Sequence, residues 1–393
     1  MTKTKLVILI LPIVVLLIFA SKGKGQNKNE FKNPHNPEHA RVYSEEGRFA
    51  AWPANHGVWS WGNEILFGFV EADFYEKAAG LHTYDQSTAR NKYARSLDGG
   101  RTWTIKDAHD LGQSARGYDH EIPKPEANQP REMKEAMDDF TDPGFILTLL
   151  RENNDHGPSH FYYSNNKGTS WKGPFRFPNL GTAGIATRTD YIVNGEQNLG
   201  VFLTVAKSNK EEGRVAYART TDSGLNWEIV SWIGEEPGGF DIMPSSIRLS
   251  ETDIYTTIRS RTPKGLDLIT AYLSTDNGKT WKKMPTPVHD TGRGGSPPAL
   301  LQLEDGRLAL AYIYRSEHGS RVNIRLSEDN GQSWSDEIML RGGDGASRDV
   351  GYPRMVQRPD GKLLIIYYWN HALLEDATPY RYIAATIVDP KNL

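Results

Sequence analysis

The chain has 393 residues, a formal net charge of −3, ten tryptophans and no cysteine. Without cysteine, the sequence excludes a disulfide framework, a thiolate metal site and a lipid-modified cysteine. Basic residues form no cluster, so we expect no nucleic-acid partner and, once the N-terminal signal described next is removed, no membrane partner.

Lys3 and Lys5 precede an unbroken apolar run at residues 6–20, and a polar segment follows. This order is typical of a secretory signal, and the run is shorter than the roughly 20 residues that span a bilayer. We expect a signal peptide at 1–25, a flexible segment at 26–38 and one domain at 39–393, with an uncleaved anchor as the alternative. Cleavage would remove four lysines and no acid, moving the net charge from −3 to −7. The prediction is a secreted or periplasmic protein.

An eight-residue pattern that begins with Ser or Thr and ends with Trp occurs five times. Its Asp or Asn side chain folds back onto backbone N–H groups, and its glycine adopts the positive φ of a tight turn. The final Trp is expected to pack between neighbouring sheets. The starts lie 68, 56, 54 and 53 residues apart, which indicates a repeat architecture. The five copies, called boxes below, are residues 96–103, 164–171, 220–227, 274–281 and 327–334.

Strands and turns account for the chain between these boxes. A proline or small residue before an apolar strand marks six unit starts. The sequence therefore predicts an all-β, six-bladed β-propeller, with seven blades as the alternative. A strand around residues 41–43 would close the ring by joining the last blade. The six starts are Pro53, Pro143, Gly184, Pro244, Pro297 and Pro353.

The repeats resemble those of the Asp-box (BNR, sialidase-like) β-propellers over essentially the whole mature length. The resemblance implies the fold and places the boxes on the outer rim, away from the central channel where a ligand would bind. Sialidases of this group have an Arg-Ile-Pro motif whose arginine grips the substrate carboxylate, whereas Ala51 stands at the matching position here. The resemblance therefore favours a propeller other than a true sialidase.

Histidines stand near the first unit start, with His56 just after it and His82 in the following loop. The pair resembles the one in propellers that act on uronates: ulvan-type lyases, rhamnosyl-glucuronate enzymes and an ulvan oligosaccharide dehydratase. There a base removes the C5 proton of the uronate while an acid protonates the oxygen leaving C4. Histidine and tyrosine suit either role. The expected catalytic residues are His56, His82 and Tyr118.

Arginine is the expected partner of a uronate carboxylate, because its planar fork of donors matches the two oxygens. The expected substrate-binding residues are Arg90, Arg151, Arg188, Arg259 and Tyr352. For each of these residues a purely structural role stays open. No cofactor and no metal site are assigned, although a structural metal ion stays open.

Three functions remain open from the sequence. The first is β-elimination on an ulvan-like uronate oligosaccharide, by a lyase or a dehydratase, giving an unsaturated uronate at the non-reducing end. The second is an exo-acting glycoside hydrolase of the sialidase type, with Glu71, Asp73 and Asp241 as candidate carboxylates. The third is a non-catalytic carbohydrate-binding propeller. The expected partner is an acidic oligosaccharide or polysaccharide, bound by a monomer.

Overall fold

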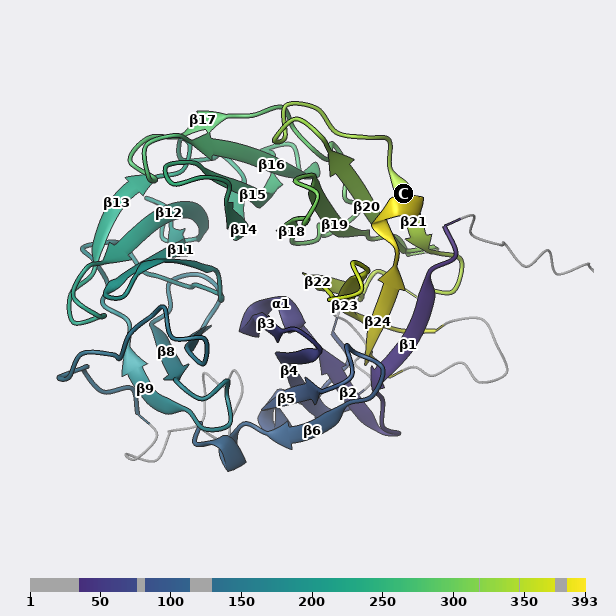
Figure 1. Cartoon of the computed structure of the whole chain (residues 1–393), viewed down its shortest axis with the longest axis horizontal. Helices are drawn as coiled ribbons and strands as arrows, with labels where there is room; N and C mark the ends of the chain where they lie inside the picture. Colours follow the sequence, from purple (N-terminus) through teal and green to yellow (C-terminus); the bar gives the residue numbers. More distant parts are fainter. Residues whose placement is uncertain (1–34, 76–81, 114–128, 318, 346, 372–379) are drawn as a thin grey trace, which may run out of the picture. The chain divides into compact units, whose positions relative to one another are not determined.

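The computed structural model describes residues 35–75, 82–113, 129–317, 319–345, 347–371 and 380–393. The expected signal peptide lies outside these residues, as does most of the segment 26–38. Almost all regular structure is β-strand, in six antiparallel sheets arranged in a ring (Figure 1). The predicted six-bladed propeller is confirmed. Within the described ranges, no helix is long and apolar enough to cross a membrane.

Three blades have four strands each, running in chain order from the channel to the rim (Figure 1). Blade 3 contains β10 (Tyr191–Gly195), β11 (Asn198–Ala206), β12 (Glu212–Thr220) and β13 (Glu228–Trp232). Blade 4 contains β14 (Phe240–Arg248), β15 (Ile254–Arg261), β16 (Asp267–Ser274) and β17 (Lys282–Lys283). Blade 5 contains β18 (Ala299–Gln302), β19 (Leu308–Tyr314), β20 (Arg321–Ser327) and β21 (Ile338–Arg341).

The other three blades depart from this plan. Blade 1 contains β2 (Arg48–Ala51), β3 (Val58–Trp61), β4 (Glu64–Asp73), β5 (Arg90–Ser96) and β6 (Thr104–Asp107). Blade 2 has three described strands, β7 (Ile146–Arg151), β8 (Ser159–Ser164) and β9 (Lys172–Arg176). Blade 6 contains β22 (Gly351–Gln357), β23 (Leu363–Trp369) and β24 (Tyr382–Val388). Short 3-10 turns lie at Gln86–Thr88, His109–Leu111 and Pro390–Asn392.

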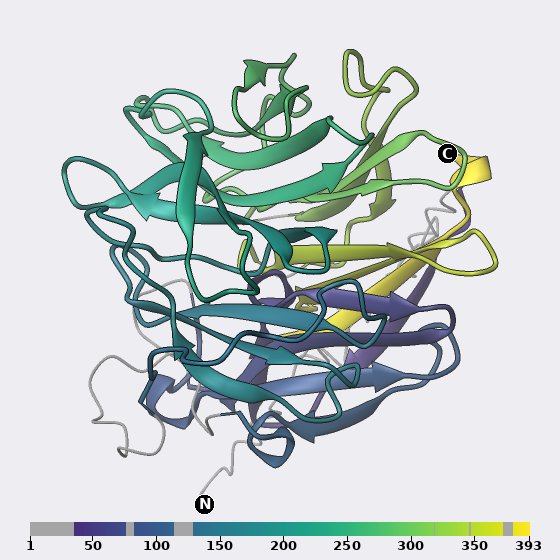
Figure 2. The ribbon, with the colours of Figure 1, turned by 60° about the vertical axis from the view of Figure 1, so that its left-hand side comes forward.

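The ring is closed by β1 (Glu38–Tyr43), which pairs antiparallel with β24 on the outer edge of blade 6. Figure 2 shows blade 6, in yellow, beside the purple strands of blade 1. The N-terminal strand thus joins the last blade, as the sequence predicts. Closure of this kind covers a sheet edge that would otherwise be open to pairing.

The predicted unit starts fit the inner strands. Pro244 and Pro353 lie inside β14 and β22, where both ladders shift register, because proline cannot donate a ladder hydrogen bond. Pro143 precedes β7, the first described strand of blade 2, so this predicted start fits as well. The box of blade 2 follows its second described strand, β8, whereas in blades 3, 4 and 5 the box follows the third strand.

The apolar core lies between neighbouring blades. Trp171 of the second box, for example, stacks on Tyr93 of blade 1 with ring centroids 5.2 Å apart. All five box tryptophans belong to inter-blade clusters or pack against them, which confirms their predicted role: Trp103, Trp171, Trp227, Trp281 and Trp334.

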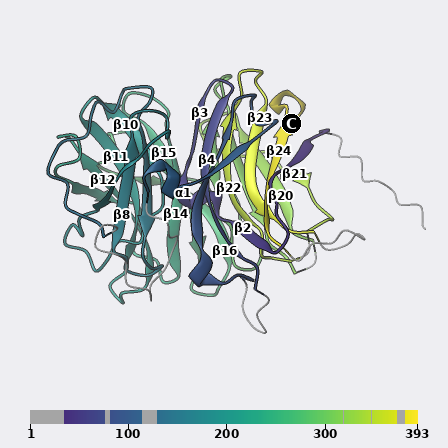
Figure 3. The same cartoon turned by 90° about the horizontal axis from the view of Figure 1, so that it is seen from below.

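The inner edge of blade 1 is interrupted by a short helix, α1 (Pro53–His56). β2 and β3 pair with different halves of β4, and α1 between them lies in the middle of the ring (Figure 1, Figure 3). Gly68 on β4 makes room for the helix, since a Cβ there would lie 2.6 Å from the His56 Cβ. Ala54 packs against Ile242 and Met243 of blade 4. Thus α1 occupies part of the channel, and Asn55 in the helix and Trp52 just before it lie at the site.

Candidate active site

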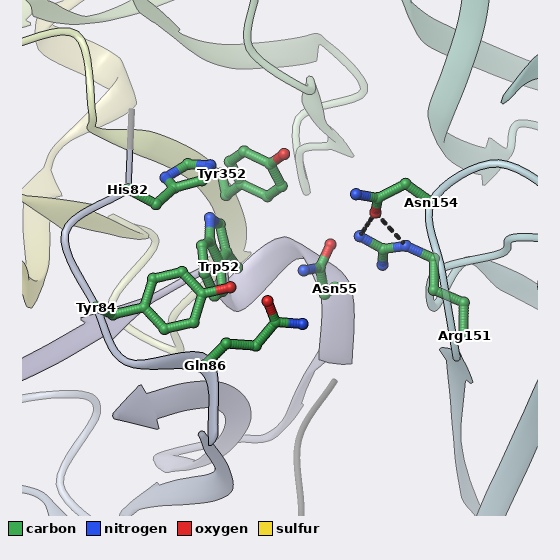
Figure 4. Close-up of a pocket in the computed structure, with 8 residues that line it drawn as sticks. All are labelled: Trp52, Asn55, His82, Tyr84, Gln86, Arg151, Asn154 and Tyr352. Carbon is green, nitrogen blue, oxygen red and sulfur yellow. Dashed lines mark hydrogen bonds between the residues drawn. The ribbon is translucent and has the colours of Figure 1, made fainter. Parts of the chain in front are cut away.

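A pocket of about 290 Å³ opens where the inner strands begin (Figure 4). Blade 1 supplies most of its lining, from α1 and from the loop after β4, while blades 2 and 6 supply the remainder. In Figure 4, Arg151 and Asn154 lie across the cavity from His82 and Tyr352. The lining residues are Trp52, Asn55, His82, Tyr84, Gln86, Arg151, Asn154 and Tyr352.

His82 is held by a buried carboxylate. Its Nδ1 lies 2.8 Å from Asp349 Oδ1, and Asp349 also accepts hydrogen bonds from Tyr368 Oη at 2.9 Å and Arg381 Nε at 3.0 Å. Burial alone would raise the pKa of Asp349, but His82, Arg381 and Tyr368 together lower it below its ordinary value. An ionised Asp349 accepts from Nδ1–H, so Nε2 is the nitrogen that His82 offers to a ligand.

Tyr352 has a strained backbone and cationic surroundings. Its φ of 56° lies in the left-handed region, a conformation that costs a bulky residue about 1–3 kcal/mol and clusters at functional sites. Arg259 donates to its hydroxyl at 3.3 Å, and the Arg315 guanidinium lies 5.4 Å from its ring centroid. Burial raises the pKa of Tyr352, but Arg259, Arg315, Arg188 and Arg151 outweigh burial and lower it from 10.

Among the described residues, four arginines act on Tyr352 through their charge, and one of them, Arg151, also lines the pocket. Each of the four is held by hydrogen bonds. Arg151 donates through Nε and Nη2 to Asn154 Oδ1 at 3.0 and 2.9 Å. Arg188 pairs with Glu212, and Arg259 donates to the Gly294 carbonyl. Arg315 donates to the Val350 carbonyl at 2.7 Å. In the part of the chain that the structure describes, no carboxylate lines the pocket. The site is therefore suited to an anionic ligand.

Comparisons with known proteins identify the family. The model of the BNR repeat-like domain matches residues 158–365. The chain belongs to this BNR repeat-like family. A search of curated proteins finds no match.

Solved structures resemble this BNR propeller in fold. A Dyadobacter fermentans protein of unknown function has a TM-score of 0.66 and 21% identity, covering 90% of this chain and 98% of its own. The Hadza microbial sialidase Hz136 has a TM-score of 0.57 and 14% identity, covering 88% of this chain and 66% of its own. A Penicillium chrysogenum α-L-arabinanase complexed with arabinobiose has a TM-score of 0.54 and 13% identity, covering 90% and 99%.

The BNR propeller brings five of the predicted site residues to one place. His82, Arg151 and Tyr352 line the pocket. Arg188 and Arg259 are buried and act on Tyr352 through their charge. These five come from blades 1, 2, 3, 4 and 6, so the ring is what assembles them.

Three predicted residues are not placed in the pocket. His56 is fully buried in α1, and neither ring nitrogen has a hydrogen-bond partner among the described residues. Burial, then Arg151 and Arg354, lower the pKa of His56 to about 3, so its imidazole is neutral. Arg90 is exposed at the first position of β5, and Tyr118 lies outside the described residues. A catalytic role for His56 or Tyr118 stays a prediction.

The carboxylates suggested for a hydrolase do not gather at this pocket. Glu71 is buried and paired with Arg48, which also pairs with Asp73. Asp241 lines a different hollow, in blade 4. Across the described ranges, no three His, Asp or Glu side chains are grouped to hold a metal ion.

Sequence reasoning missed the residues that orient the site. Asp349 stands three positions before Tyr352. This closeness in sequence could have indicated its role, because a carboxylate near a candidate site residue can pair with a site histidine. Asn55 gave no signal of its own. Its position depends on α1, and its buried Oδ1 has no hydrogen-bond partner among the described residues.

Proposed function

We propose that this BNR propeller catalyses β-elimination on a uronate-containing oligosaccharide. One observation carries the proposal: a histidine backed by Asp349 and a tyrosine among arginines share a pocket that has no carboxylate among its described lining residues. This set of groups suits the removal and delivery of protons beside an anion. It lacks the carboxylate pair that most glycosidases use.

The substrate carboxylate would bind to Arg151, whose guanidinium faces the cavity from the side opposite His82 (Figure 4). Neutralising that carboxylate makes the adjacent C5 proton more acidic, because negative charge develops there as the proton leaves. The amides of Asn55 and Gln86 supply hydrogen bonds to sugar hydroxyls. The rings of Trp52 and Tyr84 supply apolar contact for the sugar faces.

His82 Nε2 then removes the C5 proton, and Asp349 stabilises the resulting imidazolium. The electron pair of the C5–H bond forms the C4–C5 double bond as the C4–O bond breaks. The leaving oxygen takes the proton of the Tyr352 hydroxyl, and Arg259 stabilises the phenolate left behind. Proton exchange with water returns both residues to their starting forms. If the leaving oxygen carries a sugar the reaction is a lyase cleavage, and if it is a free hydroxyl the reaction is a dehydration.

Hydrolysis is the second candidate, favoured by the lowered pKa of Tyr352. A phenolate among arginines is the setting that a tyrosine nucleophile needs, and sialidases use such a nucleophile. Similar folds also include structures described as a sialidase and an α-L-arabinanase. Those descriptions support a carbohydrate substrate under either candidate.

The test is to incubate the purified protein with ulvan oligosaccharides and, separately, with sialosides, following ultraviolet absorbance and product mass. We expect absorbance to rise as the double bond conjugated with the carboxylate forms. Loss of one water without chain cleavage would identify a dehydratase, and chain cleavage with rising absorbance a lyase. Addition of one water with no absorbance change would overturn elimination in favour of hydrolysis.

A further inference from the structure

Arg315, the residue that follows β19, is buried behind the pocket. Its side chain is only 3% exposed, and it is not among the described residues that line the cavity. Its backbone is fixed on both sides, because Arg315 N donates to the Thr291 carbonyl and the Arg315 carbonyl accepts from Arg293 N, each at 3.0 Å. The guanidinium therefore extends from a fixed point toward the residues at the start of blade 6.

One set of contacts joins Arg315 to the histidine of the site. Arg315 Nη2 donates to Tyr368 Oη at 3.0 Å, and Tyr368 Oη donates to Asp349 Oδ1 at 2.9 Å. The same oxygen of Asp349 bonds to His82 Nδ1. Burial, followed by the charge of Asp349, raises the pKa of Tyr368 well above 10, so its hydroxyl stays protonated and remains a donor. Two hydrogen bonds thus join Arg315 to the carboxylate that holds His82.

A second set of contacts joins Arg315 to the tyrosine of the site. The guanidinium lies 5.4 Å from the Tyr352 ring centroid, within the range of a cation–π contact. Its Nε donates to the Val350 carbonyl at 2.7 Å. A Cβ at Gly351 would lie 3.4 Å from both Nε and Nη2, so the backbone passes directly over the guanidinium. One planar group therefore contacts residues 350, 351 and 352 in succession.

The charges along this path suit the two proton transfers. In the proposed reaction His82 becomes an imidazolium, which faces the Asp349 carboxylate, and Tyr352 becomes a phenolate. Arg315 then lies between two negative groups and interacts with both, with Asp349 through the Tyr368 hydroxyl and with Tyr352 directly. The planar fork of a guanidinium can make these contacts at once, whereas the single ammonium of a lysine cannot.

We propose that Arg315, acting with Tyr368, is the positioning residue that fixes the acid Tyr352 relative to the base His82. The proposal rests on the proposed function for the roles of His82 and Tyr352. Neither Arg315 nor Tyr368 is among the described residues that line the pocket. Their loss should therefore lower kcat and leave KM nearly unchanged.

The first test compares Tyr368→Phe with Tyr367→Phe in steady-state rates and thermal melts. Tyr367 is the matched control because it is the next residue on β23, points to the opposite face and is equally buried. Its hydroxyl accepts from Arg341 Nη1 at 3.2 Å and bonds to Thr386 Oγ1 at 2.7 Å. Both variants should lose similar stability. Only Tyr368→Phe should lower kcat, by about tenfold, because the acid and the base are then less well aligned.

The second test needs no substrate. Ultraviolet absorbance of phenolate is followed as the pH rises, and the Tyr352 signal is what disappears when each protein also has Tyr352→Phe. Arg315→Gln should move the ionisation of Tyr352 to higher pH, because a cation that favours the phenolate is lost. Arg341→Gln, the matched control, should leave it unchanged. The other arginines that act on Tyr352 keep their charges in both variants: Arg151, Arg188 and Arg259.

The outcomes separate this positioning role from the proposed reaction. Wild-type kcat in Tyr368→Phe, an equal loss of kcat in Tyr367→Phe, or unchanged ionisation in Arg315→Gln would overturn the role even if the wild type forms unsaturated product. A selective loss of kcat with a moved ionisation would support it even if the product is that of hydrolysis. If no acidic oligosaccharide is turned over, the proposed function fails and the titration alone decides the role of Arg315.

Discussion

The rim and the channel of this propeller are built in opposite ways. In the fourth box, Asp276 accepts hydrogen bonds from the backbone N–H groups of Lys279 and Thr280, three and four residues away. At the channel, His82 bonds to Asp349 and Arg354 bonds to the Ala54 carbonyl, pairs separated by 267 and 300 residues. Rim turns are therefore complete within one hairpin, whereas the site exists only when the ring has closed. Rim substitutions should change stability, and channel substitutions should change activity.

The largest effect is expected from Tyr352→Phe. Removing the hydroxyl removes the acid that protonates the leaving oxygen, and loss of a positioned acid lowers kcat by about a thousandfold. The ring and its packing are retained, so the melting temperature should stay close to that of the wild type. Steady-state rates on the substrate give kcat, and a thermal melt gives the melting temperature. A variant within a few-fold of wild-type kcat would remove Tyr352 from the mechanism.

Asp349→Asn tests whether the buried carboxylate positions His82. We expect kcat to fall about a hundredfold, because an amide in place of the carboxylate no longer stabilises the imidazolium that forms as His82 takes the proton. The same change removes one charge of the buried Asp349–Arg381 ion pair and should cost about 3 kcal/mol of folding free energy.

Rates are therefore measured well below the melting temperature. A melting temperature that falls while kcat stays unchanged would show that Asp349 stabilises the fold without positioning His82.

On the rim, Asp276→Ala should lower the free energy of unfolding by about 1–2 kcal/mol, because two backbone donors lose their acceptor. The value of kcat should not change. Asp276→Asn is the matched control and should be close to neutral, since Asn166 has the same place in the second box and accepts from Ser170 N at 2.9 Å. Urea unfolding measures both variants. Loss of activity in Asp276→Ala would contradict the expectation that rim residues affect stability and not activity.

The smallest effect is a loss of stability in acid. Hydrogen bonds from the Thr280 and Ser333 side chains and backbones lower the pKa values of Asp276 and Asp329 to about 2, against about 3.9 for an unfolded Asp. Their contribution is complete above about pH 4 and is lost as the pH falls toward 2. Melting temperatures over this range should fall less steeply in Asp276→Asn than in the wild type. If the melting temperatures of the two proteins fell equally steeply with pH, the contribution assigned to Asp276 would be contradicted.

Features formed by residues close together in the sequence could be predicted, and features formed by residues far apart could not. Each of the five boxes contains its turn and its inter-blade tryptophan within eight residues. The propeller fold could therefore be predicted from the sequence, as could its closure by β1. The candidate pocket was predicted in part: His82, Arg151 and Tyr352 were named because of residue type and place near blade starts. His56 stands as close to a blade start, yet α1 directs it into the core against Gly68. Nothing local signals that helix, nor the pairing of His82 with Asp349 across the ring closure.

The most direct test of the central claim is turnover in water labelled with heavy oxygen, followed by mass spectrometry of the products. Elimination breaks the C4–O bond without adding water, so the unsaturated uronate and the released fragment should contain no label. Hydrolysis places an oxygen from water in a product. Unlabelled products with a new double bond would support elimination at the His82–Tyr352 pocket. A labelled, saturated product would contradict it and identify a glycoside hydrolase.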